Sequence, residues 1–151
     1  MLLTDEQKRA NKVQRVLERF RGQSIGKCLA ETARLFQKHV RLSSIERDGK
    51  LTCCSCGKRD YPGRHFDAGH WISRRKAATA LDKRNCHPQC VACNRFDSTG
   101  KSKHGYDAFM RECYGQEVMD ELVRLSNTSR QFTRDELAEM YVGFLETMPK
   151  G

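Results

Sequence analysis

Long apolar runs are absent from this sequence of 151 residues, and none approaches the roughly 20 residues that a transmembrane helix needs. A membrane-spanning protein is therefore excluded, and we expect no membrane partner. The first residues, MLLTDEQKRANK, contain neither an apolar stretch nor a small-residue cleavage site, so we expect no secretory signal. Apolar residues, at 38% of the chain, are nevertheless too frequent and too periodic for a wholly disordered protein. The length suits one compact domain, with or without helical arms.

Positive charge is in excess and unevenly distributed. The formal net charge is +9, and residues 1–52 carry 12 basic and 6 acidic side chains, whereas residues 53–105 carry 11 and 4. Residues 106–151 reverse the balance, with 5 basic and 9 acidic side chains. A basic surface indicates a polyanionic partner, most simply nucleic acid, which we expect on the first two thirds of the chain. We expect the acidic C-terminal segment to pack, to face solvent or to meet a protein partner.

Helical periodicity predicts helices at both ends of the chain. Thr4 with Gln7, and Thr133 with Glu136, have the spacing of capping boxes at helix N-termini. The pattern predicts helices that cover about residues 5–21, 26–42, 106–113, 118–125 and 134–148. The apolar positions expected to face the core in the last helix are Leu137, Met140, Tyr141, Phe144, Leu145 and Met148.

Apolar periodicity is weak between these helical ends, where six of the eight cysteines are concentrated. A segment that cannot bury a core by itself indicates a fold organised by a metal ion. We therefore divide the chain into a basic helical N-terminal arm (1–47), a zinc-knuckle core (48–105), and C-terminal helices (106–151) that pack on the core or form a dimer interface.

Two CxxC pairs, Cys53-x-x-Cys56 and Cys90-x-x-Cys93, carry the metal prediction. Four thiolates from two such pairs form the usual closed, tetrahedral structural site for Zn²⁺. A disulfide framework is disfavoured because we expect a reducing, cytoplasmic location. Cys54 and Cys86 are neighbours that we leave out of the site, and Cys28 and Cys113 fall on apolar helical faces as expected buried thiols. Because a zinc ion with four sulfur ligands has no open position, this site is scaffolding and the chemistry must lie elsewhere.

The residues between the two pairs place His70, Asn85 and Asn94 in the order His, Asn, Asn, with Asp67 and His87 beside them. This order resembles the HNH, or ββα-metal, nuclease motif in its zinc-knuckled form. The resemblance implies an α+β fold with a small ββα-metal core in which a β-hairpin and a helix are held by the cysteines. It also implies that His70 is the general base and that Asn94, directly after the second pair, ligates a divalent cation.

A closer resemblance comes from the runs FDAGHWIS, RNCHPQCVACN and GQEVMDEL. Together they resemble the NinG family of lambdoid phages, the Rap-type recombination endonucleases, over about residues 45–148. The resemblance implies a structure-selective DNA endonuclease that cuts Holliday junctions and other branched DNA, acting in the bacterial host cytoplasm. Symmetric cutting of a junction is simplest with a two-fold dimer, so we expect a homodimer.

The residues themselves support hydrolysis of a phosphodiester. A neutral imidazole at His70 can accept a proton from water near pH 7. Mg²⁺ or Mn²⁺ prefers oxygen ligands, and Asp67 and the amide oxygen of Asn94 are the best candidates. Asn85 is expected to fix the loop that carries His70 or to hold its tautomer. For His87 three roles stay open: contact with phosphate, ligation of the metal, or capping of the fold.

One departure from the general HNH pattern affects Asp67. Many HNH enzymes have Asp directly before the base, where this chain has Gly69. Asp67 has odd spacing from His70, and side chains alternate along a strand. A kink at Ala68-Gly69 would therefore be needed to bring Asp67 and His70 to one metal.

Basic side chains around the motif are the expected DNA contacts, mainly with phosphates, which give affinity but little sequence specificity. They are Arg64, Arg74, Arg75, Lys76, Lys83, Arg84, Arg95, Lys101 and Lys103. Trp71 is expected to pack against the zinc fold rather than to stack on a base. Two alternatives to a junction endonuclease remain: a non-catalytic zinc DNA-binding protein, and an HNH nuclease acting on linear or nicked DNA.

Overall fold

A computed structural model describes residues 1–150, and the chain divides into two compact units. The first unit comprises Met1–His39 together with the chain from Gln131 onward, and the second comprises Val40–Arg130. The boundary lies inside one helix, and the last helix belongs with the first. The three consecutive segments expected from the sequence therefore do not coincide with the two units.

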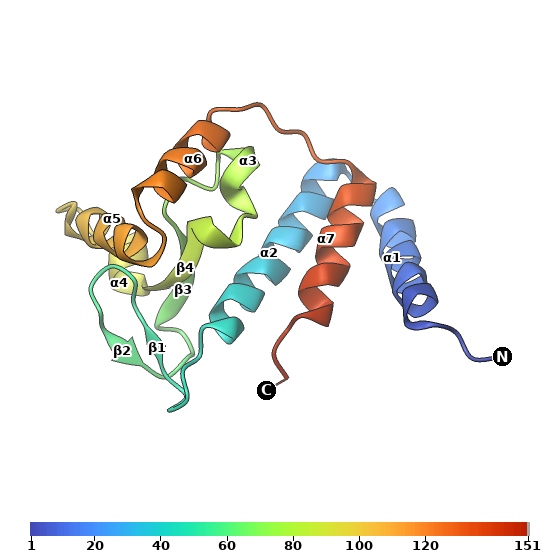
Figure 1. Cartoon of the computed structure of the whole chain (residues 1–151), viewed down its shortest axis with the longest axis horizontal. Helices are drawn as coiled ribbons and strands as arrows, with labels where there is room; N and C mark the ends of the chain where they lie inside the picture. Colours follow the sequence, from blue (N-terminus) through green and yellow to red (C-terminus); the bar gives the residue numbers. More distant parts are fainter. Residues whose placement is uncertain (151) are drawn as a thin grey trace. The chain divides into compact units, whose positions relative to one another are not determined.

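Three helices build the first unit: α1 (Asp5–Arg21), most of α2 (Ile25–Ser43) and α7 (Arg134–Glu146) (Figure 1). Both predicted capping boxes are present, because Thr4 and Thr133 each accept from the backbone N–H three residues on, and Gln7 and Glu136 bond back. Such reciprocal bonds satisfy N–H groups that have no partner inside the helix. The strongest sequence signals for helix starts are therefore confirmed.

Aromatic rings fill the core of the first unit. The rings of Phe20 on α1 and Tyr141 on α7 meet edge to face at 5.9 Å, and those of Phe36 and Phe144 lie 5.3 Å apart. Two acidic side chains of α7 pair with basic ones of α1. The Arg9 guanidinium lies 2.7 Å from a Glu139 oxygen, and Glu146 contacts both Arg9 and Lys12. Part of the C-terminal acidic charge thus packs against the basic N-terminal helix.

The expected core face of α7 is wrong in part. Leu145 is 47% exposed, whereas Ala138 and Val142, which the sequence pattern did not single out, are fully buried. Packing between α1 and α2 selects the stripe through positions 137, 138, 142 and 144 rather than the broader apolar set. The expectation for Cys113 is also wrong, because its thiol is exposed at the end of α5.

Two short antiparallel hairpins form the sheets of the second unit. Strand β1 (Leu51–Thr52) pairs with β2 (Arg59–Asp60), and β3 (Phe66–His70) pairs with β4 (Cys86–Cys90). Between β3 and β4 lie α3 (Ala77–Ala80) and the 3₁₀ turn Lys83–Asn85. Strand β4 leads directly into α4 (Val91–Arg95), so a hairpin is followed by a short helix.

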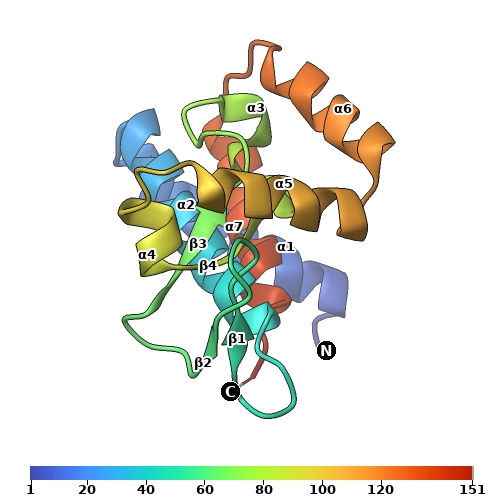
Figure 2. The same cartoon turned by 90° about the vertical axis from the view of Figure 1, so that its left-hand side faces the viewer.

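Two further helices complete the second unit: α5 (Lys101–Cys113) and α6 (Gln116–Ser126). In both views α3 lies beside α6, at the opposite end of the unit from β1 and β2 (Figures 1 and 2). One apolar cluster gathers Tyr106, Met110 and Leu122 of these helices, and a smaller one gathers Leu51 and Phe66 around two of the CxxC cysteines.

Helix α5 approaches the first cysteine pair very closely at Gly105. A β-carbon at this position would lie 2.8 Å from the carbonyl carbon of Ser55, between Cys53 and Cys56. Only glycine therefore permits this distance between helix and loop.

The fold is thus α+β, with seven α-helices and two small sheets among residues 1–150, as the sequence predicted. Within the same residues, no helix is both long enough and apolar enough to span a membrane.

Candidate functional site

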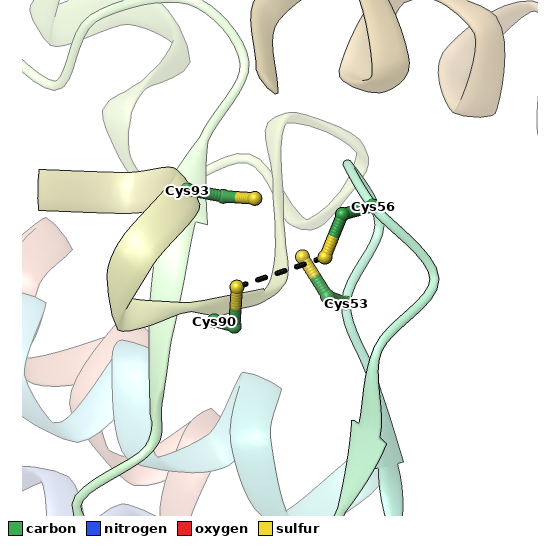
Figure 3. A group of neighbouring side chains, drawn as sticks. All are labelled: Cys53, Cys56, Cys90 and Cys93. Carbon is green, nitrogen blue, oxygen red and sulfur yellow. Dashed lines mark hydrogen bonds between the residues drawn. The ribbon is translucent and has the colours of Figure 1, made fainter. Parts of the chain in front are cut away.

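The two CxxC pairs come together as predicted. The sulfurs of Cys53, Cys56, Cys90 and Cys93 all lie within 4.8 Å of one another, and those of Cys56 and Cys90 are 3.8 Å apart (Figure 3). A tetrahedron with Zn–S bonds of about 2.3 Å places its sulfurs about 3.8 Å apart, so this donor set fits Zn²⁺. The first pair lies in the loop between β1 and β2. The second pair spans the end of β4 and α4, so a bound zinc would join the β1–β2 loop to α4.

The backbone prepares this cluster. Gly57, with φ +77°, closes the first loop so that its N–H donates to the Cys53 carbonyl at 2.9 Å. The Cys54 N–H donates to the Pro88 carbonyl at 3.0 Å and ties this loop to β4. Cys54 and Cys86 are buried outside the sulfur cluster, in agreement with their exclusion from the predicted site.

Asp67 and Asn94, the two predicted ligands of a catalytic cation, are brought together by β3 and α4. The Asn94 amide nitrogen donates to Asp67 Oδ2 at 2.9 Å, and the Arg95 guanidinium forms two further bonds to the same carboxylate, at 2.8 and 2.6 Å. Burial opposes ionisation of Asp67, but the bonds from Arg95 and Asn94 outweigh it and hold its pKa below the ordinary value. The carboxylate is therefore charged at neutral pH.

Asp67 and His70 lie on opposite faces of the hairpin. The pairing of β3 with β4 is regular over five consecutive residues, from Phe66 opposite Cys90 to His70 opposite Cys86, so the strand has no bulge. The kink at Ala68-Gly69 that would bring Asp67 and His70 to one metal is absent. The Asp67–Asn94 pair is thus assembled without a direct contribution from the His70 ring.

The structure gives a physical reason for glycine at position 69. A β-carbon there would lie 2.9 Å from both Cβ and Cδ of Gln89, which is buried and donates through Nε2 to Ser55 Oγ at 2.8 Å. A carboxylate side chain at position 69 therefore has no room, because Gln89 fills the space.

His70 ends β3 with its ring mostly buried. Its Nε2 lies 2.8 Å from the Ala80 carbonyl, and because a carbonyl only accepts, Nε2 carries the proton and Nδ1 is the basic nitrogen. Burial lowers the pKa of His70, opposed by the bond to Ala80 and assisted by the charge of Arg74. The imidazole is therefore neutral at pH 7, as a general base requires.

Asn85 organises the loop that follows His70. Its side chain is fully buried, accepts from the Ile72 N–H at 2.8 Å, and donates to the carbonyls of Ile72 and Thr79 at 3.0 and 3.1 Å. The Asn85 carbonyl also accepts from the Trp71 N–H at 3.0 Å. Of the two roles expected for Asn85, these contacts correspond to fixing the loop.

His87 lies apart from Asp67 and Asn94, in a pocket of aromatic rings. Its Nδ1 lies 3.0 Å from the Tyr106 hydroxyl, its Nε2 lies 2.7 Å from the Tyr114 hydroxyl, and the Phe109 ring packs at 4.8 Å. Burial lowers the pKa of His87 to about 4. Because both ring nitrogens are already hydrogen-bonded, ligation of a metal or contact with phosphate through His87 would require this arrangement to break.

The predicted DNA contacts fall into two groups. Arg84 pairs with Asp82 and Glu121, Arg95 pairs with Asp67, and Lys103 pairs with Asp107. The others are exposed: Arg64, Arg74, Arg75, Lys76, Lys83 and Lys101. The exposed group includes the Arg74–Lys76 run directly after the His70 strand, and the paired side chains of Arg95 and Lys103 are themselves 58% and 57% exposed.

Trp71 is packed, as expected, against a cluster that includes Cys54 of the first CxxC loop. Its ring contacts the apolar cluster of α5 and α6, its Nε1 donates to Asp107 at 2.7 Å, and Lys103 lies 4.8 Å over its ring. The indole therefore anchors the start of the loop after β3 to α5.

Sequence reasoning missed Arg41 and Tyr106. The charge of Arg41, at the end of α2, contributes to lowering the pKa of Asp67, although 26 residues separate them. Tyr106 donates its hydroxyl to the Gly69 carbonyl at 2.8 Å, although the sequence pattern placed it only at the start of an expected helix. No local spacing signals either contact, because both join elements distant in the chain.

Comparison with known proteins places these features in a family. The family model described as "Bacteriophage Lambda NinG protein" matches residues 3–148, which is nearly the whole chain. Protein ninG of Escherichia phage 933W is 35% identical over 95 residues, covering 62% of this chain and 45% of that protein, and protein ninG of Escherichia phage lambda is 34% identical over the same length. Protein ninG of Salmonella phage P22 is 40% identical over 63 residues, 41% of this chain and 30% of that protein.

The matched region thus spans less than half the length of these curated relatives. No solved structure matches this chain. The family match covers both cysteine pairs, the β3–β4 hairpin, α4 and the helices of both units, and on this basis the chain belongs to the NinG family.

Proposed function

We propose that this protein is a metal-dependent DNA endonuclease that cuts four-way junctions and other branched DNA. The observation that carries the proposal is the contact between Asp67 on β3 and Asn94 on α4, at 2.9 Å. Strand β3 ends in the neutral imidazole of His70. Metal-assisted hydrolysis of a phosphodiester uses oxygen donors for a cation and a neutral base, and here one hairpin carries both, on its opposite faces.

Each group has one role in this proposal. His70 Nδ1 accepts the proton of the attacking water, since Nε2 is committed to Ala80. Asp67 and Asn94 would hold Mg²⁺ or Mn²⁺ through their oxygens, because the Asn94 amide donates to Asp67 through nitrogen and its oxygen is an acceptor. A bound cation would stabilise negative charge at the scissile phosphate and the leaving oxygen. Asn85 keeps the loop after His70 in place.

The zinc-fitting cluster supports the proposal as a scaffold. Cys90 and Cys93 flank the start of α4, and Asn94 follows Cys93 directly, so a zinc ion on the four sulfurs would hold Asn94 near β3. The basic surface supports DNA as the partner, with contacts to phosphate that weaken steeply with salt. Reduced thiolates suit a cytoplasmic site of action.

Selectivity for branched DNA and a two-fold dimer complete the proposal. Both rest on the similarity to the NinG family, and two symmetric cuts in a junction need two active sites. Light scattering of the protein bound to an immobile junction should give the mass of two chains per junction. The mass of one chain would contradict the dimer.

The decisive experiment is cleavage of a labelled immobile four-way junction by the zinc-loaded protein with Mg²⁺ or Mn²⁺. A linear duplex of the same sequence and the His70→Ala protein run alongside, with His104→Ala, at an exposed histidine, as the matched control. We expect paired cuts near the branch, no cuts in the duplex, normal activity in His104→Ala, and at least a hundredfold slower cutting by His70→Ala.

The remaining outcomes separate the alternatives. Equal cutting of junction and duplex would contradict branch selectivity and indicate a general HNH nuclease. Tight binding of the junction without cutting by the wild-type protein would contradict the endonuclease and indicate a zinc DNA-binding protein.

A further inference from the structure

Four hydrogen-bonding groups form a row that ends at the peptide between Gly69 and His70. The Tyr114 hydroxyl lies 2.7 Å from His87 Nε2, His87 Nδ1 lies 3.0 Å from the Tyr106 hydroxyl, and that hydroxyl lies 2.8 Å from the Gly69 carbonyl oxygen. The row runs from half-buried Tyr114, after α5, through β4 to β3. It connects three parts of the second unit with the backbone directly before the proposed base.

The direction of each bond follows from the chemistry of the last acceptor. A carbonyl oxygen only accepts, so the Tyr106 hydroxyl donates its single proton to the Gly69 carbonyl. The Tyr106 oxygen can then only accept from His87, which places the ring proton on Nδ1. A neutral imidazole has one N–H, so Nε2 accepts and Tyr114 donates to it.

The surroundings are consistent with this single direction. Burial lowers the pKa of His87 to about 4, so at neutral pH the ring carries one proton rather than two. Cys54 packs in the same apolar cluster as Tyr106. The tight ring contacts of His87 with Phe109 and Tyr106 leave the imidazole little freedom to flip.

We propose that Tyr106 is a positioning residue for His70, and that His87 and Tyr114 orient the Tyr106 hydroxyl toward the Gly69 carbonyl. This inference rests on the proposed endonuclease function. Gly69 pairs with His87 in the hairpin, and the Tyr106 hydroxyl adds a side-chain bond to the peptide that carries His70. Tyr106 holds the backbone before His70, while the Asn85 carbonyl holds Trp71 directly after it. His87 thus acts through Tyr106 and not on the substrate.

The test compares Tyr106→Phe, which removes the hydroxyl but keeps the ring, with Tyr141→Phe, at a tyrosine of the other unit. Single-turnover cutting of the junction by Tyr106→Phe should be about tenfold slower, because a small loss of alignment lowers the rate of the chemical step. Its dissociation constant for the junction and its zinc content should match the wild type. Tyr141→Phe should cut at the wild-type rate.

Nitrogen-15 NMR of the His87 imidazole reports on the row of hydrogen bonds and does not depend on enzymatic activity. In the wild type, we expect the His87 Nδ1 shift of a protonated nitrogen and the Nε2 shift of a bare one. In Tyr114→Phe, the Nε2 shift should move because its donor is lost. A proton on Nε2 in the wild type would overturn the proposed orientation, whatever the activity.

The kinetic outcomes keep the two proposals apart. A wild-type protein that cuts the junction while Tyr106→Phe cuts equally fast would overturn the positioning role and leave the endonuclease intact. If the wild-type protein cuts no DNA although the NMR signature is present, the endonuclease proposal is wrong. The catalytic role proposed for the row of hydrogen bonds is then wrong as well.

Discussion

At position 69, the side chain of one residue on the neighbouring strand, Gln89, determines which residue can be accommodated. Gln89 occupies the space that any side chain at position 69 would need, and the carboxylate nearest to His70 in β3 is therefore Asp67. Sequence reasoning identified the departure at Gly69 but not its cause, because Gln89 lies on the other strand. The regular register of the hairpin then decides that Asp67 meets Asn94 and not His70.

Gly69→Ala should destabilise the zinc-loaded protein by about 1–3 kcal/mol, because the new methyl group forces Gln89 out of its buried position. Urea unfolding measures the change. Gly143→Ala is the matched control, since a β-carbon there meets nothing within 4 Å and α7 should become more stable by about 0.5–1 kcal/mol. A Gly69→Ala protein as stable as the wild type would contradict the crowding seen at Gln89.

His87 should make stability depend on pH. Its pKa falls from about 6.5 in the unfolded chain to about 4 in the folded one, so the unfolded chain binds the proton more readily. The free energy of unfolding is therefore highest above about pH 6.5. Protonation of His87 lowers it by about 3 kcal/mol in total as the pH falls toward 4.

The measurement is the unfolding free energy of the wild type and of His87→Gln between pH 7.5 and 5. The wild type should lose more stability than the variant over this range, while protonation of the zinc thiolates affects both proteins alike. Parallel curves would show that the His87 ring does not titrate in this way.

At the scale of elements, capping boxes and apolar periodicity predicted the longer helices but not the positions of the strands. The capping boxes at Thr4 and Thr133 mark helix starts because their hydrogen bonds are local in sequence. Strands β1 and β2 have two residues each, and the five residues of α4 are too few to show a period. The loop between β1 and β2 nevertheless carries Cys53 and Cys56, and α4 carries Cys93 and Asn94.

The contact between β3 and α4 yields a prediction about metal binding. Asp67→Asn removes the charge that would hold a divalent cation, and we expect at least tenfold weaker binding of Mn²⁺, measured by electron paramagnetic resonance. Stability should change by less than about 1 kcal/mol, because the ion pair of Asp67 with Arg95 is partly exposed.

Asp120→Asn, on the exposed face of α6, is the control and should bind Mn²⁺ like the wild type. Both variants should keep one zinc per chain, since the four cysteines are unchanged. Equal Mn²⁺ affinity in Asp67→Asn and the wild type would exclude Asp67 as a ligand of the cation.

At the scale of the whole molecule, the two compact units should respond differently to the loss of zinc. The first unit has a core of aromatic and aliphatic side chains from α1, α2 and α7. Around the cysteines the apolar cluster is small, so a zinc ion would supply much of the stability there.

Removal of zinc by a strong chelator should therefore speed amide hydrogen exchange in residues 51–60 and 86–95, while α1 and α7 remain protected. Mass spectrometry of peptic peptides resolves these segments, and Cys90→Ser should reproduce the pattern without the chelator. Uniform loss of protection over the whole chain would contradict the predicted difference between the two units.

Several properties were determined by the sequence alone: the helices with their caps, the pairing of two CxxC motifs in one cluster, the basic character, and the order of the motif residues. Each depends on neighbours along the chain or on side-chain chemistry, which a sequence displays directly. The tertiary structure decided which side chains meet. It placed Asp67 with Asn94 and Arg95, it enclosed His87 between two tyrosines, and it grouped α7 with α1. These contacts join residues far apart in the chain, and they depend on strand register and on packing volume, which no local pattern records.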